Sequence, residues 1–535
     1  MNGLGLAAIH ACWLATCLHE AMEFSRVSRQ PIRRIQEEAL RTILAANAET
    51  AFGRRYGFGR IRSVKAFQAE VPQVEYEDLI PWIEEAASGA PTVLTADPVE
   101  LFELTSGSSG GTKLIPYTRG LQEAFNRAIH PWLVDLYSRR PELALGRAYW
   151  VISPRVTREE RTAAGIPVGF KNDAEYFGRW GKRLIDAVMA VPSDVLRNAD
   201  GESWRFATLL SLLRAEDLRL VSLWNPTFLP ALLRDLAPLG DRLADALETE
   251  SPGRARMLRT LLPDLLAGRD EGLGTRLWPN LRLISTWTEG EAAAGIPSLR
   301  LLFPGVQLET KGLLATEGAV TIPRSGAPAP VLAVRSGFFE FQEGEEGDGA
   351  CRTAAELEPG GRYRVLITTP GGLYRYRLHD IVEMKGWWRS LPALAFSGKE
   401  SMVSDLCGEK LNARHVERVL SRLLGSGSAA FLAPERDLAG RSAPHYCLFV
   451  PLEHLSSDFE TLANRLEEAL RENFHYRWCR EAGQLGPAEV VALSFDRRDL
   501  ETRRLARISG EGARAGTAKM AALDRRTGWK TALRP

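Results

Sequence analysis

Apolar residues along this chain follow two kinds of pattern: short continuous runs, and stripes at helical spacing. The short runs are rich in Val, Leu and Ile, and they predict buried strands at residues 149–152, 218–223, 281–287, 306–309, 331–334 and 363–369. Stripes that recur every three or four residues predict helices at residues 26–53, 206–214 and 228–236. Another stripe follows Thr118, which is expected to cap a helix there. Because strands alternate with helices, the pattern predicts an α/β fold with much parallel sheet.

Residues 386–399 separate this region from a second set of elements. The second set consists of predicted helices at residues 412–424 and 458–474 and predicted strands at residues 429–432, 446–450 and 489–494. We therefore expect a large N-terminal α/β domain with mixed sheets, residues 1–397, and a smaller C-terminal α+β domain, residues 398–535. The basic tail from residue 503 has little periodic pattern, so we expect it to be mostly irregular.

Composition and charge narrow the class of protein. The chain has 535 residues, of which 45% are hydrophobic and 25% charged, which is ordinary for a soluble globular protein. Its net charge is +1, so no large basic surface is expected and a nucleic-acid partner is disfavoured. Small molecules are the expected partners.

Six scattered cysteines form no CxxC pair and no cysteine–histidine cluster at ligand spacing. This spacing argues against structural zinc and against a disulfide scaffold, and it favours the reducing cytoplasm. The apolar residues 1–20 lack a basic start and a cleavage site and are short for a bilayer. We expect a buried or surface-packed helix there, without stable membrane insertion.

A loop rich in serine and glycine gives the first indication of chemistry. From Thr105 to Lys113 the chain holds three glycines, three serines, two threonines and one lysine, with a strand-like run on each side. Glycine permits positive φ, and successive N–H groups and hydroxyls can then enclose an anion. A flexible turn can have the same composition, but the lysine and the flanking strands favour a polyphosphate loop. The expected ATP-binding residues here are Thr105, Ser106, Gly107, Ser108, Ser109, Gly110 and Lys113.

This loop differs from a Walker loop, which needs Gly before the lysine, Ser or Thr after it, and then a helix. Here Thr112 precedes Lys113, Leu114 follows it, and a strand is predicted next. The sequence TSGSSGGTKLIPYT resembles the Gretchen Hagen family of auxin-responsive acyl-acid amido synthetases. That family lies within the adenylate-forming superfamily of acyl-CoA synthetases and firefly luciferase. Residues 221–233, 277–290 and 320–323 resemble the bacterial members of the family.

The resemblance implies an ATP and metal site at residues 311–318, KGLLATEG. In the superfamily an aromatic-x-x-Ser/Thr-Glu motif lies along the adenine and holds Mg²⁺, a cation typically bound by one or two carboxylates and phosphate oxygens. Thr316 and Glu317 match this motif, and Leu313 occupies the aromatic position. The alternative for Glu317 is a solvated carboxylate.

A second implied ligand is Asp380, which would accept hydrogen bonds from the ribose hydroxyls. The family motif Tyr-Arg-x-Gly-Asp appears here as Tyr376-Arg377-Leu378-His379-Asp380, with histidine in place of glycine. If this strand is regular, Tyr376 and Asp380 share one face. The alternative is an ion pair of Asp380 with Arg375 or Arg377. His379 is either a packing residue or a proton acceptor for an incoming amine.

The resemblance also implies a mobile C-terminal domain that turns about a Gly-Arg hinge, here Gly398-Lys399. Lys410 matches a lysine directed at the α-phosphate, with a surface lysine as the alternative. Lys519 lies in a Gly-x-x-Lys run, where the superfamily has the lysine that serves the first half-reaction. Trp287 and Phe338 are expected to line the acyl pocket unless they only pack the core.

Together these features predict an acid–amino-acid ligase that uses ATP and Mg²⁺. It would convert a carboxylic acid to an acyl-AMP, release pyrophosphate, and form an amide with an amine such as an amino acid. A coenzyme A ligase shares the first half-reaction and remains an alternative. A nucleotide-binding regulatory protein without catalysis is another, because Leu313, His379 and Lys399 depart from the family motifs.

Overall fold

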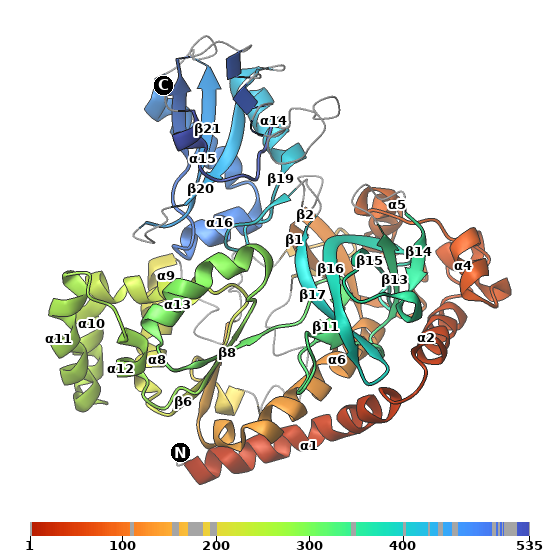
Figure 1. Ribbon diagram of the computed structural model, residues 1–535, viewed down its shortest axis with the longest axis horizontal. Coiled ribbons are helices and arrows are strands. Elements are labelled where there is room, and N and C mark those ends of the chain that lie inside the picture. Colours follow the sequence, from red (N-terminus) through yellow and green to blue (C-terminus); the bar gives the residue numbers. More distant parts are fainter. Residues whose placement is uncertain are drawn as a thin grey trace. The chain divides into compact units, whose positions relative to one another are not determined.

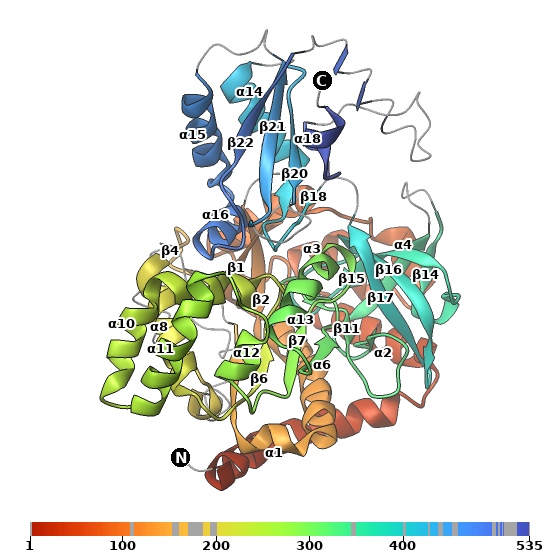
Figure 2. The same ribbon diagram turned by 60° about the vertical axis from the view of Figure 1, so that its left-hand side comes forward.

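The computed structural model describes residues 3–106, 112–151, 160–169, 186–192, 201–343, 349–399, 403–425, 428–436, 442–451, 458–494 and 522–533, together with 184, 499, 500, 503, 504 and 507. The chain divides into two compact units, drawn from two directions in Figures 1 and 2. The large unit is Met1–Thr105 with Lys113–Glu400, and Ser401–Pro535 is the main part of the small unit.

The prediction of a single helix over residues 26–53 is wrong. α1 (Gly3–Val27) ends near the start of this range. α2 (Ile32–Ala46) is a separate helix within the range, and α3 (Ala51–Arg55) begins near its end. Pro31 precedes α2 with ψ of 121°. Proline has no N–H to continue a helix, and it disfavours helical geometry in the residue before it. The chain therefore turns between α1 and α2.

α1 packs along α6 (Arg119–Arg139), which agrees with the expectation of a packed helix. The Trp13 ring lies 5.9 Å from the ring of Tyr137, and His10 Nε2 lies 3.1 Å from the carbonyl oxygen of Gly146. Among the described residues, α1 is the one helix that is long and apolar enough to cross a membrane, judged by length and composition. Thr118 caps α6 as predicted, because its hydroxyl accepts the N–H of Leu121 at 3.2 Å.

A parallel sheet of four strands confirms the α/β prediction. Its order is β3-β6-β7-β8, and all its neighbouring strands are parallel. The strands are β3 (Arg147–Trp150), β6 (Leu218–Ser222), β7 (Leu283–Thr286) and β8 (Gln307–Thr310). The helices of this region are α8 (Gly201–Arg214), α9 (Phe228–Arg234), α10 (Leu236–Glu248), α11 (Pro252–Leu266), α12 (Leu273–Leu277) and α13 (Ile296–Leu302).

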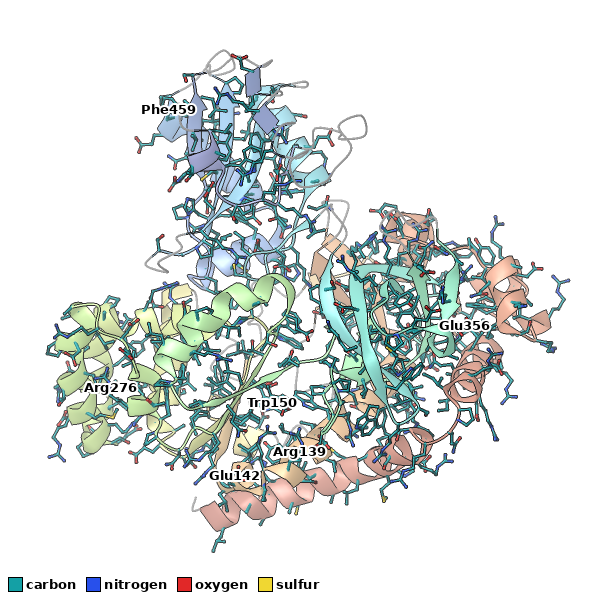
Figure 3. All side chains as sticks on the ribbon, in the orientation of Figure 1. Arg139, Glu142, Trp150, Arg276, Glu356 and Phe459 are labelled. Atoms are coloured by element: carbon teal, nitrogen blue, oxygen red, sulfur yellow. The ribbon has the colours of Figure 1, made fainter. Side chains whose placement is uncertain are left out.

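Arg139 and Trp150, both labelled in Figure 3, mark the place where α6 meets this sheet. Trp150 ends β3, and its ring lies 6.3 Å from that of Trp132 on α6. Arg139 near the end of α6 pairs with Glu309 of β8 at 3.2 Å. These contacts fix the parallel sheet against α6, which itself follows the strand after the Ser/Gly loop.

A seven-stranded sheet forms the rest of the core, in the order β11-β12-β17-β16-β15-β13-β14. Its strands are β11 (Thr321–Ile322), β12 (Val331–Leu332), β13 (Phe338–Glu343), β14 (Cys351–Thr353), β15 (Arg362–Thr368), β16 (Tyr376–Trp388) and β17 (Leu391–Lys399). Residues 386–399, which we interpreted as a boundary, are part of the β16–β17 hairpin. Residues 391–395 are buried in the large unit, whereas Trp387 is exposed, and the predicted division at residue 397 falls inside β17. α4 (Val64–Glu70) and α5 (Tyr76–Ala87) pack in the same core.

The small unit has a three-stranded sheet of order β20-β21-β22. It consists of β20 (Phe431–Glu435), β21 (His445–Pro451) and β22 (Glu489–Leu493), with α14 (Ala413–Leu424), α15 (Phe459–Leu470), α16 (Phe474–Glu481) and the short α18 (Trp529–Ala532). The predicted helix 458–474 ends earlier, at Leu470. Asn473 starts a new helix, because its side chain accepts the N–H of Tyr476 at 3.0 Å.

Candidate active site

The Ser/Gly loop lies between two strands, as predicted. β1 (Val99–Ser106) precedes it and β2 (Thr112–Thr118) follows it, in a sheet of order β2-β1-β5-β4 with β5 (Pro167–Val168) and β4 (Glu160–Arg161). The chain thus leaves the loop as a strand and not as the helix of a Walker loop. Gly107, Ser108, Ser109 and Gly110 lie outside the described residues, as do the side chains of Thr105 and Ser106.

Lys113 is directed into the protein. Its side chain is buried, and Nζ donates a hydrogen bond to the Tyr376 hydroxyl at 3.0 Å. The ammonium lies 5.2 Å from the ring centre of Tyr76 and 5.6 Å from that of Tyr376, within range of cation–π attraction. The Tyr76 hydroxyl in turn accepts the N–H of Leu114 at 2.8 Å. Two tyrosines therefore fix the strand that leaves the loop.

Glu317 lies at the turn between two short strands, β9 (Leu314–Ala315) and β10 (Gly318–Ala319). The base of this turn is held by two hydrogen bonds, from Leu313 N–H to the Thr321 hydroxyl at 2.8 Å and from Val320 N–H to the Leu313 carbonyl at 2.9 Å. Leu313, in the aromatic position of the family motif, packs half-buried against the main core. Thr316 and Glu317 are half-buried.

Tyr376 links the lysine and the glutamate. Burial raises the pKa of the Tyr376 hydroxyl well above its usual range, and the carboxylate of Glu317 is the strongest of the charges that raise it further. Lys113 therefore contacts the Tyr376 hydroxyl directly, and the charge of Glu317 acts on the same hydroxyl. In the chain Lys113 and Glu317 are separated by β3 to β8.

Asp380 lies four residues after Tyr376 on β16, and its side chain is buried. The predicted alternation holds, because Tyr376, Leu378 and Asp380 are buried whereas His379 is half-buried. The strand is irregular at this point: Arg377 faces Leu366 and Ile381 faces Arg364, so three residues oppose Val365 alone. His379 in this bulge has φ of +62°, a conformation that favours glycine. The backbone thus explains why the family motif has glycine at the position of His379.

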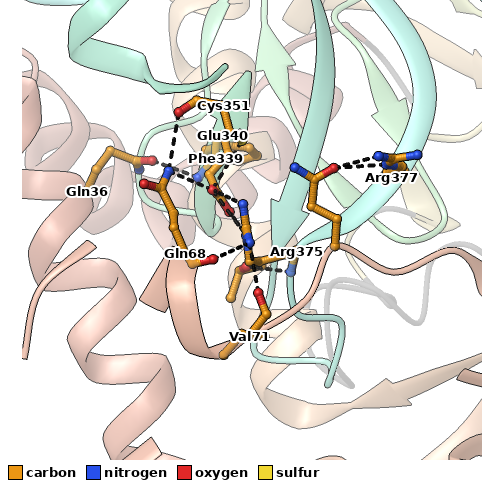
Figure 4. Close-up of polar contacts among 10 residues, drawn as sticks. Gln36, Gln68, Val71, Phe339, Glu340, Cys351, Arg375 and Arg377 are labelled. Carbon is orange, nitrogen blue, oxygen red and sulfur yellow. Dashed lines mark hydrogen bonds and ion pairs between the residues drawn. The ribbon is translucent and has the colours of Figure 1, made fainter. Parts of the chain in front are cut away.

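The two neighbouring arginines take partners other than Asp380 (Figure 4). Arg375 forms a buried ion pair with Glu340 of β13 at 3.0 Å and donates to the carbonyl oxygens of Gln68 and Val71. Arg377 donates to the Gln73 side chain at 2.7 Å. The buried arginine therefore fixes the end of α4 to the strand that carries Asp380.

Trp287, one of the two residues expected to line the acyl pocket, lies at the carboxyl ends of the parallel strands, where ligands of such sheets usually bind. Trp224 follows β6, Trp287 follows β7 and Lys311 follows β8. The two indole rings lie 5.4 Å apart, and the Lys311 ammonium lies 4.2 Å from the ring centre of Trp224. Both tryptophans are half-buried and Lys311 is buried. Our sequence interpretation missed Lys311, although a lysine directly after the last strand of a parallel sheet was a usable signal.

Phe338, the other expected pocket residue, begins β13 and is 1% exposed. Its ring packs edge to face with Phe67 of α4, 5.9 Å between centres. The structure therefore places Trp287 at the carboxyl end of an inner strand of the parallel sheet. It places Phe338 on a strand of the seven-stranded sheet, within the main core.

Lys410 belongs to the small unit and lies in the turn of a hairpin, with φ of +43°. Burial and the charge of Lys410 lower the pKa of His475 on α16 to about 3. The ammonium of Lys410 thus lies near an imidazole that is neutral at pH 7. Lys519 lies outside the described residues.

Comparison with known protein families covers most of the chain. The GH3 family N-terminal domain matches residues 20–308, the central domain matches residues 330–399, and the C-terminal domain matches residues 414–521. The chain belongs to the GH3 family.

Curated relatives agree with this membership. The indole-3-acetic acid-amido synthetase GH3.2 of Arabidopsis thaliana is 25% identical over 439 residues, covering 72% of this chain and 77% of the relative. The indole-3-acetic acid-amido synthetase GH3.8 of Oryza sativa subsp. indica is 27% identical over 514 residues, covering 85% and 83%.

Solved structures show the same fold. The GH3.15 acyl acid amido synthetase superposes with a TM-score of 0.62 at 20% identity, covering 96% of this chain and 94% of that one. The same enzyme in complex with 2,4-DB gives a TM-score of 0.65, with 97% and 95% covered. The expected architecture of a large α/β part and a smaller α+β part is thereby confirmed.

Proposed function

We propose that this protein is an acyl-acid amido synthetase that activates a carboxylic acid with ATP and transfers the acyl group to an amino acid. The main support is that all three GH3 domains match in order along the chain, and that relatives spanning most of it are amido synthetases. Lys113, which is hydrogen-bonded to Tyr376, and Glu317, whose charge acts on the same hydroxyl, suit the phosphates and the cation of a nucleoside triphosphate.

The first half-reaction joins a carboxylate oxygen of the acid to the α-phosphorus. The bond between the α-phosphorus and the bridging oxygen breaks, and pyrophosphate leaves. In the second half-reaction the amine nitrogen attacks the acyl carbon, the carbon–oxygen bond to AMP breaks, and the nitrogen loses a proton. The products are an amide and AMP.

The residues of the large unit have distinct proposed roles on ATP. The loop residues Ser106, Ser108 and Ser109 and the ammonium of Lys113 would hold the β- and γ-phosphates. Asp380 is buried on β16, and its two carboxylate oxygens suit the two ribose hydroxyls. Thr316 would lie along the nucleotide.

Glu317 would hold Mg²⁺, whose charge offsets that of the leaving pyrophosphate. The donor set fits this ion, because Glu317 is a half-buried carboxylate at the tip of a hairpin, and Mg²⁺ takes one or two such ligands with phosphate oxygens. Lys410 and Lys519 would neutralise charge at the α-phosphate during the two half-reactions.

The acid is proposed to lie against Trp287, with Trp224 beside it, at the carboxyl edge of the parallel sheet. A cytoplasmic location is proposed as well, because all six cysteines are free thiols, as a reducing compartment requires.

The central test is acid-dependent exchange of labelled pyrophosphate into ATP, followed by mass spectrometry of products from a panel of acids and amino acids. We expect exchange with at least one acid, and then an amide and AMP. A thioester with coenzyme A, and no amide, would identify a coenzyme A ligase instead. Absence of exchange across a broad panel of acids would contradict adenylation.

The metal role of Glu317 has its own test. Glu317→Gln keeps the size of the side chain and removes its charge, so we expect the Mg²⁺ concentration for half-maximal exchange to rise about tenfold or more. Glu84→Gln, at an exposed position of α5 in the same unit, is the matched control and is expected to change nothing. Normal Mg²⁺ dependence in the Glu317 variant would refute the assignment.

A further inference from the structure

The hairpin of β18 (Val403–Ser404) and β19 (Leu411–Asn412) encloses residues 405–410, with Lys410 at the end of the turn. Gly408 has φ of +111° and Lys410 has φ of +43°. A lysine rarely adopts this left-handed conformation, which persists only where the surroundings hold the backbone in place. Some nearby group must therefore fix this turn.

Glu409, directly before Lys410, is that group. Its side chain is fully buried, and its carboxylate accepts the N–H groups of Leu406 at 2.6 Å and Cys407 at 2.8 Å. The Tyr446 hydroxyl and the Cys407 thiol also contact it, the thiol at 3.3 Å. The next N–H along the chain, that of Gly408, donates to Asp405 at 2.7 Å. Side-chain oxygens thus satisfy three successive backbone donors.

The same donors argue against a metal site at this place. The thiols of Cys407 and Cys479 and the Glu409 carboxylate have donor atoms within 4.8 Å of one another, a set that could attract a soft metal ion. Burial raises the pKa of the Glu409 carboxyl group above its usual range, and four groups already donate to its two oxygens, which offer about four acceptor positions. Burial also raises the pKa of the Cys407 thiol well above its usual range, so this thiol stays protonated and donates. The cluster is therefore built to hold the turn.

Lys410 is the one residue of this turn that carries a positive charge. Its side chain is half-buried, and it lies close enough to His475 on α16 to help lower the pKa of that imidazole. A neutral imidazole does not repel the ammonium. Glu409 holds the backbone on the N-terminal side of Lys410.

We propose that Glu409 is a positioning residue for Lys410. It holds the backbone of residues 405–410 so that the Lys410 ammonium is presented in one direction, and it touches no substrate itself. The inference rests on the proposed function, in which Lys410 serves the α-phosphate. Misplacing a charge that acts in the transition state lowers kcat, whereas binding of ground-state ATP through the large unit is unaffected.

The test uses the full-length protein and compares amide synthesis by wild type, Lys410→Ala, Glu409→Gln and the double variant. Glutamine keeps the size of Glu409 but turns one acceptor into a donor that opposes a backbone N–H. We expect kcat to fall about 10- to 100-fold in Glu409→Gln. The KM values for ATP and the acid should stay within about twofold of the wild type, because binding energy made elsewhere is retained. Glu417→Gln, exposed on α14, is the matched control and should keep wild-type kinetics.

The double variant separates positioning from general damage. If Glu409 acts through Lys410, Glu409→Gln has no further effect once Lys410 is alanine, because effects of residues that act as a unit are not additive. Multiplied losses in the double variant, or a wild-type kcat in Glu409→Gln, would overturn the inference. Full activity of Lys410→Ala would instead contradict the proposed role of Lys410.

Tyr446→Phe gives a second route in case Glu409→Gln does not fold. It removes one donor to Glu409 and keeps a buried aromatic ring. We expect a smaller fall in kcat, about three- to tenfold, again without a change in KM and again absent in a Lys410→Ala background. An unchanged kcat in a folded Tyr446→Phe protein would count against the positioning role.

Discussion

The Lys113 ammonium donates a hydrogen bond to the Tyr376 hydroxyl at 3.0 Å, although the two residues are 263 positions apart in the chain. Lys113 follows the Ser/Gly loop, and Tyr376 begins the strand that carries Asp380. This one contact therefore connects the strand proposed to hold the phosphates with the strand proposed to hold the ribose.

Removing the acceptor of that hydrogen bond should weaken the large unit. Tyr376→Phe leaves the Lys113 ammonium buried without this partner, and we expect the free energy of unfolding to fall by about 1.5–3 kcal/mol, as for other hydrogen bonds to charged groups. Urea denaturation measures the loss. Tyr363→Phe is the control, because its buried hydroxyl accepts only a neutral N–H, from Glu358 at 3.1 Å, and should cost about 1 kcal/mol. Equal losses in both variants would show that the lysine contact adds nothing.

The buried pair of Arg375 and Glu340 should be sensitive to loss of one partner. Arg375→Met leaves the Glu340 carboxylate, 1% exposed, without its cation, and breaking such pairs costs about 3–5 kcal/mol. Arg422→Met, in an exposed pair with Glu472, should cost less than about 1 kcal/mol. Calorimetric melting compares the two. A small effect at Arg375 would mean that water reaches Glu340.

His379 tests the backbone interpretation of the family motif. With φ at +62°, a β-branched residue is strained by about 1–3 kcal/mol, whereas glycine is not. We expect His379→Val to destabilise the protein and raise the KM for ATP, since the bulge that carries Asp380 would shift. His379→Gly should keep the KM for ATP near that of the wild type. If the glycine variant instead lost amide synthesis at an unchanged rate of pyrophosphate exchange, the imidazole itself would have a role with the amine.

The half-buried imidazole of His475 should make the small unit sensitive to acid. Burial and the Lys410 charge lower the pKa of His475 from 6.5 to about 3, so the unfolded chain binds this proton at a higher pH than the folded one. The stability due to the neutral ring is complete above pH 6.5 and is lost as the pH falls toward 3, by at most about 1.4 kcal/mol per pH unit. We expect the difference in unfolding free energy between wild type and His475→Gln to decrease between pH 7 and pH 5. His19→Gln, exposed on α1, should show no such change.

The sequence predicted the inner strands of the parallel sheet well, because β6 and β7 are short, mostly apolar and buried runs, as inner parallel strands are buried on both faces. It failed where a local feature interrupted a pattern. Pro31 divides the apolar stripe of residues 26–53. Asn473 caps a new helix inside the range predicted as one helix, residues 458–474. Residues 386–399 were interpreted as a boundary, because nothing local shows that β17 pairs with β16 and with β12.

In the candidate site, the sequence predicted the residues that belong to short motifs, at residues 105–113 and 376–380. Glu409 was missed, since neither motif nor charge distinguishes it from a surface residue. Lys311 was missed although it directly follows the last strand of the parallel sheet. Both side chains are buried through tertiary contacts. Lys311 contacts Trp224, and Glu409 contacts Leu406, Cys407 and Tyr446.

The sequence by itself determined the family, the type of loop and the order of the motifs, because these depend on residue identity and spacing along the chain. Only the tertiary structure decided that Lys113 and Tyr376 meet, that Arg375 serves Glu340 rather than Asp380, and that His379 lies in a conformation that favours glycine. Each of these depends on strand register and burial, which are set by the packing of segments far apart in the chain and which no local pattern encodes.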